Sequence, residues 1–291
     1  GVPIFNYIVV IDDVLMKVTD VIRGEDHLPN TPKQIMVARA LGFESPRYAH
    51  LPLVLGDDKK KLSKRHGITS VENYRSDGYL PEALVNYIAT LGWASESGDE
   101  ILSRDRLAAE IDLSKLGKSA AVFDFQKLRW MNGNYIRSYD LDKIIALFTP
   151  YLEKAGYDLS SVDRAYLVDV VALVRGKCEL LSDIVKYARL FLDKTPEPDE
   201  EADALLKTDN GKKIIAAARD LVNGEINAEN FLTDFTNKIK ETTGCKGKDL
   251  FHPIRALITS SLAGPDLADA MRVLGFVRCA ARVGFIAQRY L

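Results

Sequence analysis

Residues 18–55, VTDVIRGEDHLPNTPKQIMVARALGFESPRYAHLPLVL, decide the fold of the first part of this chain. Two runs in this stretch, Val18–Ile22 and Tyr48–Leu55, are apolar and rich in β-branched or aromatic residues, so each predicts a strand. Between them, Thr31 predicts the N-cap of a helix, a proline follows at the first helical position, and Gly42 ends the helix. A strand, a helix and a strand in this order indicate an α/β unit.

The residues on either side of this stretch extend the same unit. Upstream, Tyr7–Ile11 (YIVVI) predicts a further buried strand that ends at Asp12. Downstream, residues 56–67 (GDDKKKLSKRHG) predict a polar loop that follows the last strand. We therefore expect residues 1–68 to form an α/β domain.

After residue 68 the sequence has helical periodicity. Thr69 with Glu72 predicts a capping box, and Asp124 predicts the start of a helix that reaches Gly133. The acidic, proline-containing segment Thr195–Glu201 is the best candidate boundary in the later half. The predicted fold class is α/β followed by all-α, with residues 69–139, 140–194 and 195–291 as helical parts. The other clear predicted helices are Leu80–Gly92, Val162–Arg175, Lys177–Leu192, Gly211–Val222, Asn227–Glu241 and Asp266–Leu274.

The composition indicates a folded protein without a strong charge bias. The 291 residues are 47% hydrophobic, which is enough for about two or three domains. Because 39 Lys+Arg stand against 41 Asp+Glu, nucleic-acid contacts must come from local basic patches. Three widely spaced cysteines indicate a reducing, cytoplasmic location and no structural metal. We see no membrane span and no signal peptide, and we expect residue 1 to be an internal start.

The loop at residues 56–67 carries the strongest chemical signal. Five cations, Lys59, Lys60, Lys61, Lys64 and Arg65, lie within seven residues after a predicted strand. Open α/β sheets bind ligands beyond the carboxyl ends of their strands, so a polyphosphate would fit this charge. On composition alone, a solvated basic turn and a nuclear-localisation run are the alternatives.

Several ordered blocks carry a resemblance to a known family. Lys61–Arg65 (KLSKR) is similar to the K-M-S-K-S loop of class I aminoacyl-tRNA synthetases in its glutamyl form. Val21–His27 (VIRGEDH), followed by NTP and Gln34, resembles a second segment of that form. Further similar blocks are YAHLP at 48–52, GYLPEAL at 78–84, FDFQKLRWMN at 123–132 and PIR at 253–255. The whole chain thus resembles the C-terminal two-thirds of a bacterial-type glutamyl-tRNA synthetase.

This resemblance implies both an architecture and a reaction. Residues 1–68 would be the C-terminal part of a Rossmann-type catalytic domain, and 69–139 a helical stem-contact connector. Residues 140–194 and 195–291 would be two all-helical anticodon-binding subdomains. The family joins glutamate to the 3′ end of tRNA(Glu) through glutamyl-adenylate, using ATP with Mg²⁺ as its counterion. Its other ATP motif, His-x-Gly-His, is not in this sequence, so we expect the chain to be inactive alone.

The resemblance also implies an ATP site. The reaction needs no enzyme nucleophile, and catalysis consists of positioning and of stabilising charge on phosphate oxygens. Lys64 is the first candidate for the phosphates, and the remaining candidates are Lys61, Ser63, Val54, Leu55 and Asp26.

Arg23 is the candidate for the side-chain carboxylate of glutamate. It ends a predicted strand, and its guanidinium offers a rigid two-donor fork that suits a carboxylate. Pairing of Arg23 with Glu25 or Asp26 is the alternative. By the resemblance, Phe5, Asn6 and Asp26 are also expected near glutamate. Many family members place a tyrosine at the position of Phe5, and phenylalanine has no hydroxyl to donate.

The histidines and two basic residues complete the candidates. His27, His50 and His66 are expected to be local hydrogen-bonding groups, since their spacing is no metal-ligand motif. Arg175 and Lys177 interrupt an apolar helical pattern and are candidate anticodon contacts, with a plain helix C-terminus as the alternative. In the family, Lys177 aligns with a position often filled by Arg in enzymes that select tRNA(Glu) over tRNA(Gln). Charging of tRNA(Gln) therefore stays open.

Three other functions were weighed against this one. Glutaminyl-tRNA synthetase shares the catalytic pattern but has a β-barrel anticodon half, whereas residues 140–291 have helical periodicity. The truncated relative that modifies a tRNA base has no anticodon domain. A non-catalytic tRNA-binding module stays open for the chain alone. The expected partners are glutamate and tRNA(Glu), without a membrane, and the expected oligomeric state is a monomer.

Overall fold

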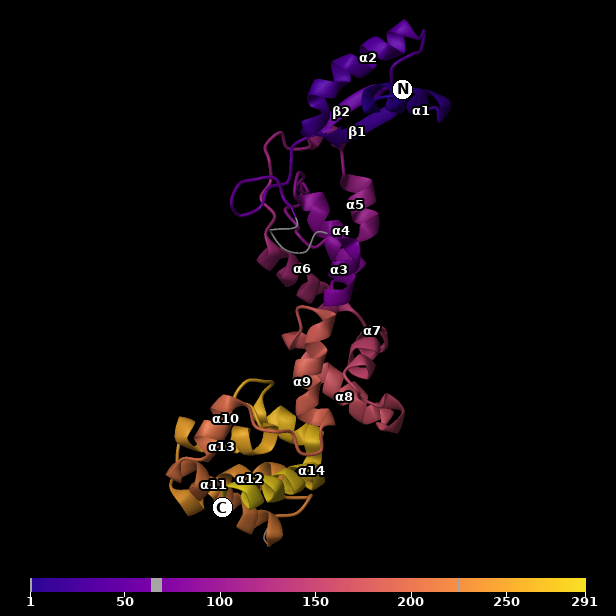
Figure 1. The fold of residues 1–291 in the computed structure, drawn as a ribbon. Coiled ribbons are helices and arrows are strands. Elements are labelled where there is room, and N and C mark those ends of the chain that lie inside the picture. Colours follow the sequence, from indigo (N-terminus) through magenta and orange to yellow (C-terminus); the bar gives the residue numbers. More distant parts are fainter. Residues whose placement is uncertain (1, 64–69, 225) are drawn as a thin grey trace. The chain divides into compact units, whose positions relative to one another are not determined.

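The computed structural model describes residues 2–63, 70–224 and 226–291. The chain divides into two units (Figure 1). Unit 1 contains residues 1–76 and 81–131, and unit 2 contains residues 77–80 and 132–291.

Unit 1 opens with the predicted α/β arrangement. Strands β1 (Asp20–Gly24) and β2 (Arg47–Leu51) form a parallel pair, with Asp20 opposite Arg47 and Gly24 opposite Leu51 (Figure 1). The 3₁₀ helix η1 (Glu25–Asn30) and helix α2 (Thr31–Ala40) connect them, as a parallel pair requires. The chain leaves α2 through Gly42, whose φ of 74° lies in the left-handed region. The second strand is shorter than predicted, because regular pairing stops at Leu51.

The predicted strand Tyr7–Ile11 is wrong, because these residues lie within helix α1 (Phe5–Leu15). The residues of α1 with the least exposure include Asn6, Val9, Val10, Asp13 and Val14. Their spacing of three and four residues is that of one helical face, which packs on α2. The run Tyr7–Ile11 resembles a strand when it is considered alone. Together with the residues that follow it, it has the spacing of a helix.

The predicted cap of α2 is also wrong in detail. The N-cap is Asn30, without a side-chain cap hydrogen bond, and Thr31 already belongs to the helix. The Thr31 hydroxyl lies between the side chains of Arg23 and His50 instead. A residue that looked like a helix signal is therefore part of a polar cluster.

The rest of unit 1 is helical. It contains α3 (Val71–Asp77), α4 (Pro81–Thr90), α5 (Arg104–Glu110), the 3₁₀ helix η3 (Leu113–Lys115) and the start of α6 (Phe125–Ser138). Asp124 caps α6 as predicted, through a 2.9 Å bond from the Lys127 N–H, but α6 continues beyond Gly133. The predicted cap Thr69 lies outside the described residues. The ring of Phe123 packs on Tyr87 and Phe125, at centroid distances of 4.9 and 4.7 Å.

Every regular element described within residues 140–291 is a helix (Figure 1). This confirms the predicted all-α part. One predicted helix is wrong at its start: Lys177–Leu192 is a helix only from Ile184, because Cys178 and Leu180 have extended backbones. The helices, with their short 3₁₀ turns, are α7 (Leu141–Lys154), η4 (Leu159–Ser161), α8 (Arg164–Val174), η5 (Arg175–Lys177), η6 (Leu181–Asp183), α9 (Ile184–Leu192), α10 (Glu200–Leu206), α11 (Asp209–Asn223), α12 (Phe231–Thr243), α13 (Lys248–Thr259) and α14 (Leu267–Tyr290).

A buried arginine connects the helices of unit 2. Arg282 on α14 is 1% exposed, and its guanidinium donates to the carbonyls of Ile258 on α13 and Asp193 after α9, at 2.7 and 2.8 Å. Burial lowers the pKa of Arg282 from its ordinary value. The two carbonyls lie at helix ends, which lack intrahelical donors, so the cation satisfies groups that the fold leaves open.

Gly78 in unit 2 is expected to tolerate no side chain. Its φ is 99°, and a Cβ would lie 2.7 Å from the backbone nitrogens of both Leu181 and Ser182. Gly156 has a similar φ of 97° but open space around it, so it serves as the matched control. We expect Gly156→Ala to cost about 1–2 kcal/mol from the backbone alone, and Gly78→Ala about 1–3 kcal/mol more.

The measurement is urea unfolding of the chain followed by far-ultraviolet circular dichroism. Gly78→Ala should have the clearly lower midpoint. Equal midpoints for the two variants would contradict the close approach at Gly78.

Candidate active site

Arg23 is the centre of a polar cluster between β1, β2 and α2. Its Nη2 donates to Thr31 Oγ1 at 2.9 Å and to Gln34 Oε1 at 2.8 Å, and its Nε lies 3.5 Å from His50 Nε2. The guanidinium also lies over the ring of Tyr48, 5.3 Å from its centroid. Thr31 and Gln34 are buried, so these contacts hold Arg23 in one orientation.

The cluster extends to α1 through Gln34. The side-chain nitrogen of Gln34 donates to Asn6 Oδ1 at 3.0 Å, which places the predicted residues Asn6 and Arg23 on either side of one glutamine. Phe5 lies next to His27, with ring centroids 5.9 Å apart, and its side chain is exposed. The predicted glutamate-site residues Arg23, Asn6 and Phe5 thus come from elements that meet around α2.

No described carboxylate is in direct contact with Arg23, although the Asp13 carboxyl, whose pKa burial raises, lies near enough for the charge of Arg23 to offset part of that rise. Within the described part of the chain, no acidic group forms an ion pair with Arg23, and its Nη1 has no hydrogen-bond acceptor. The alternative of pairing with Glu25 or Asp26 is not what the structure shows: Glu25 accepts from the Leu53 N–H, and Asp26 pairs with Lys61. A half-buried guanidinium with neutral partners is a suitable site for an anion.

The cationic loop has a fixed base. Leu55 pairs with Lys61 in an antiparallel bridge and with Val122 in a parallel one. The Leu62 N–H donates to the Val54 carbonyl at 2.9 Å, and the Gly56 N–H to the Lys60 carbonyl at 2.8 Å. The Leu55 N–H donates to the Ala121 carbonyl, and the Leu55 carbonyl accepts from the Phe123 N–H. Leu55 is a predicted ATP residue, and mainly its side chain is therefore available to a ligand.

An ion pair links the described part of the loop to η1, directly after β1. Lys61 Nζ lies 2.7 Å from Asp26 Oδ2. The hydrogen bond from Lys61 lowers the pKa of Asp26. Because the folded-state pKa is the lower one, the pair is intact above the ordinary Asp pKa and is lost as the pH falls through the lowered value. Ser63 is half-buried at the end of the described loop, and Lys64 and His66 lie outside the described residues.

The histidine prediction is confirmed for two of the three residues. His50 contacts Thr31 at 2.9 Å, and His27 Nδ1 lies 3.3 Å from Asn30 Nδ2. The described residues contain no group of three or more His, Cys, Asp or Glu side chains that could hold a metal ion.

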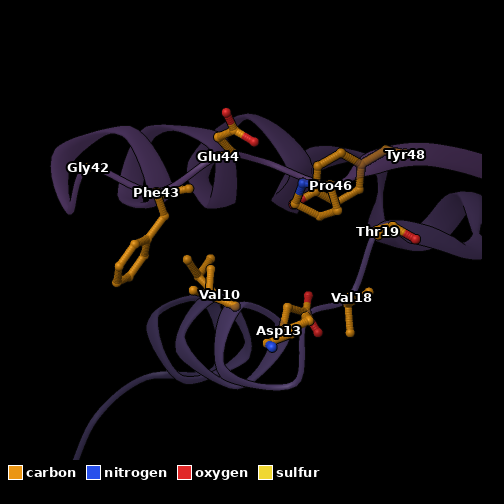
Figure 2. Close-up of a pocket in the computed structure, with 12 residues that line it drawn as sticks. Val10, Asp13, Val18, Thr19, Gly42, Phe43, Glu44, Pro46 and Tyr48 are labelled. Carbon is orange, nitrogen blue, oxygen red and sulfur yellow. The ribbon is translucent and has the colours of Figure 1, made fainter.

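A cavity of about 360 Å³ lies between the C-terminal ends of α1 and α2 (Figure 2). Val10, Val18, Phe43 and Tyr48 contribute apolar surface, and Asp13 lies on its α1 side. Burial raises the pKa of the Asp13 carboxyl. None of the predicted site residues lines this cavity.

In unit 2, the two candidate anticodon residues differ in whether their side chains are accessible to RNA. Arg175 donates to the carbonyl of Tyr139 at 2.8 Å and is half-buried, so it fixes the chain that follows α6. Lys177 is exposed, and no hydrogen bond or ion pair of its side chain is found within the described ranges. Lys177 is therefore the better candidate of the two for RNA.

Sequence reasoning did not find how Arg23 is oriented. Thr31 was interpreted as a helix cap, Gln34 as part of a family segment, and His50 as a local hydrogen-bonding group without a named partner. The available signal was a pair of polar residues, three apart, on the face of α2 that is otherwise apolar.

The comparisons with known proteins agree with this geometry and place the chain among the class I tRNA synthetases. Residues 1–130 match the catalytic domain of class I tRNA synthetases (E and Q), and residues 143–286 match an anticodon binding domain. The chain belongs to the class I tRNA synthetase family of the glutamate and glutamine type.

Its relatives are named more narrowly. The chain is 40% identical to a glutamate–tRNA ligase of Carboxydothermus hydrogenoformans over 97% of its own length and 60% of that protein. It is 42% identical to one of Heliobacterium modesticaldum, over 94% of the chain and 56% of that protein. The solved structure of a glutamate tRNA ligase of Elizabethkingia meningosepticum, in complex with its amino acid, superposes with a TM-score of 0.81 at 27% identity. That match covers 99% of the chain and 61% of the solved one.

The chain thus spans about 60% of the length of the curated relatives that it matches. None of the helices in the described residues is long and apolar enough to cross a membrane.

Proposed function

We propose that the chain is part of a glutamate–tRNA ligase and contributes its glutamate and ATP contacts and its anticodon-binding helices. The observation that carries this proposal is the oriented Arg23, whose guanidinium forms no ion pair with a carboxylate among the described residues. In the proposed reaction, the α-carboxylate of glutamate attacks the α-phosphorus of ATP, and pyrophosphate leaves. The glutamyl group of the adenylate then passes to the terminal adenosine of the tRNA, and AMP leaves.

Each candidate residue has a role in this proposal. Arg23 holds the side-chain carboxylate of glutamate, with Asn6, Phe5 and Asp26 around it. The loop residues Lys61, Ser63 and Lys64 hold the ATP phosphates, and Val54 and Leu55 contact the nucleotide. A Mg²⁺ ion bound with ATP would neutralise phosphate charge. The described residues contain no group of three or more His, Cys, Asp or Glu side chains for such an ion, so in this proposal the phosphates and water hold it.

The test of the function is glutamate-dependent ATP–pyrophosphate exchange and aminoacylation by the complete ligase, compared with the chain alone. Activity with glutamate and tRNA(Glu) in the complete ligase supports the proposal. Binding of tRNA by the chain, together with no exchange by the complete protein, would instead identify a non-catalytic tRNA-binding protein. We further propose that the protein acts as a cytoplasmic monomer.

Lys177 is proposed to contact the anticodon, and a lysine there leaves tRNA(Gln) as a possible second substrate. Lys177→Glu places a negative charge near RNA phosphates and should weaken tRNA(Glu) binding about tenfold, from lost and reversed charge. Lys177→Arg should change the ratio of kcat/KM for tRNA(Glu) and tRNA(Gln) and leave pyrophosphate exchange unaltered. Arg219→Glu, an exposed change elsewhere in unit 2, is the control. An unchanged tRNA affinity in Lys177→Glu would refute this role.

A further inference from the structure

The ion pair between Asp26 and Lys61 joins two rigid segments. Asp26 lies in the first turn of η1, and Lys61 is held at the loop base by its bridge to Leu55. The two residues are 35 positions apart, and the ammonium lies 2.7 Å from the carboxylate. The contact therefore depends on the directions of the Asp26 carboxylate and of the exposed Lys61 side chain.

Gly24 permits the direction of the Asp26 carboxylate. A Cβ at this position would lie 2.6 Å from Asp26 Oδ1, closer than such atoms approach. The backbone of Gly24, with φ −64° and ψ 148°, is one that any residue adopts. A side chain at this position would therefore require the Asp26 carboxylate to move, since this carboxylate lies over the glycine with Oδ1 and contacts Lys61 with Oδ2.

The neighbouring side chains do not replace either partner of the ion pair. Asp26 and a phosphate would therefore compete for one ammonium group, that of Lys61. Glu25 accepts a hydrogen bond from the Leu53 N–H, and the His27 ring contacts Asn30 and Phe5. Lys61 is on the loop that is proposed to hold phosphates. Asp26 takes one of the three N–H donors of Lys61, and turning the ammonium group toward a polyphosphate would lengthen or break that contact.

We propose that Gly24, Asp26 and Lys61 form a latch, in which Asp26 is a positioning residue that holds Lys61, the first lysine of the KLSKR segment, until a nucleoside triphosphate takes over its ammonium group. This inference rests on the proposed function and refines the part that Asp26 plays in it. Asp26 acts on ATP through Lys61 and competes with the nucleotide. A direct ligand of ATP or glutamate would have the opposite effect when removed.

The kinetic test is pyrophosphate exchange by the complete ligase. Asp26→Asn should lower the KM for ATP about two- to fivefold, the range expected for an exposed ion pair, with kcat unchanged. Gly24→Ala should act in the same direction, because it turns the carboxylate away. The double variant should equal Asp26→Asn alone, because both changes remove one contact. Asp20→Asn is the matched control, since Asp20 is about as exposed as Asp26 and forms an exposed pair with Arg47 across strands β1 and β2.

A higher KM for ATP or for glutamate in Asp26→Asn would overturn the latch and make Asp26 a substrate ligand. Additive effects of the two single changes would also overturn it.

A second measurement does not depend on activity. Carboxyl carbon NMR of the chain gives the titration of each aspartate. The pKa of Asp26 should rise in Lys61→Gln and in Gly24→Ala, while that of Asp20 stays unchanged. If Asp26 titrates identically in all three proteins, the latch does not exist. If the titrations follow this expectation but the wild-type ligase shows no ATP–pyrophosphate exchange, the proposed function is wrong, while the ion pair between Asp26 and Lys61 is confirmed.

Discussion

Replacing Arg23 by alanine is expected to lower kcat/KM for glutamate about a hundredfold or more in the complete ligase. Truncating one partner of a hydrogen-bonded, partly buried charge pair costs about 2–5 kcal/mol, and each 1.4 kcal/mol is a factor of ten. The large effect follows from the cluster: Thr31, Gln34 and His50 hold the guanidinium in place before the ligand arrives. A preorganised donor loses little entropy on binding, so its removal is costly.

The conservative change distinguishes binding from folding. Arg23→Lys keeps the charge but loses the two-donor fork, so it should raise the KM for glutamate and leave the KM for ATP unchanged. The helical circular dichroism of Arg23→Lys should match that of the wild type. Arg47→Lys, on the exposed side of the neighbouring strand, is the control. Normal glutamate dependence in both Arg23 variants would remove Arg23 from the site.

The order of the elements could be predicted from the sequence because it depends on local patterns. The crossover helix between two parallel strands follows from the apolar runs and from the glycine at residue 42. Helix α1 was mistaken for a strand because five of its residues, Tyr7–Ile11, are apolar in succession, and both structures accept such a run. Length would have separated the two, since the helical face continues to Val14.

The contacts of the site could not be predicted in this way. Arg23 and Gln34 are eleven residues apart and Asp26 and Lys61 thirty-five, and no periodicity relates residues on different elements. Threonine is a common helix cap, but the Thr31 hydroxyl forms its hydrogen bonds with the side chains of Arg23 and His50 instead. The predicted helix start at Lys177 is wrong for a similar reason. The Asp183 carboxylate accepts hydrogen bonds from the N–H groups of Glu179 and Leu180, in a segment that is not helical.

Lys64→Ala is expected to lower the rate of glutamate activation by the complete ligase about a hundredfold or more. The side chain belongs to the KLSKR loop, whose resemblance to the K-M-S-K-S loop assigns it to the ATP phosphates, and it lies outside the described residues. Losing one preorganised contact to charge that develops in the transition state costs about 3–4 kcal/mol. The loss should appear mainly in kcat, because the contact strengthens as the pyrophosphate leaves.

Three comparisons make this test specific. Lys64→Arg keeps the positive charge and should recover part of the rate, which a purely steric role would not explain. Lys115→Ala removes an exposed lysine elsewhere in unit 1, where it pairs with Glu96, and should leave exchange unaltered. Transfer of glutamate from preformed adenylate to tRNA should be affected less than activation, since its leaving group is AMP rather than pyrophosphate. Near-normal pyrophosphate exchange by Lys64→Ala would contradict the assignment, and the phosphates would then have to be held by Lys61 and its neighbours alone.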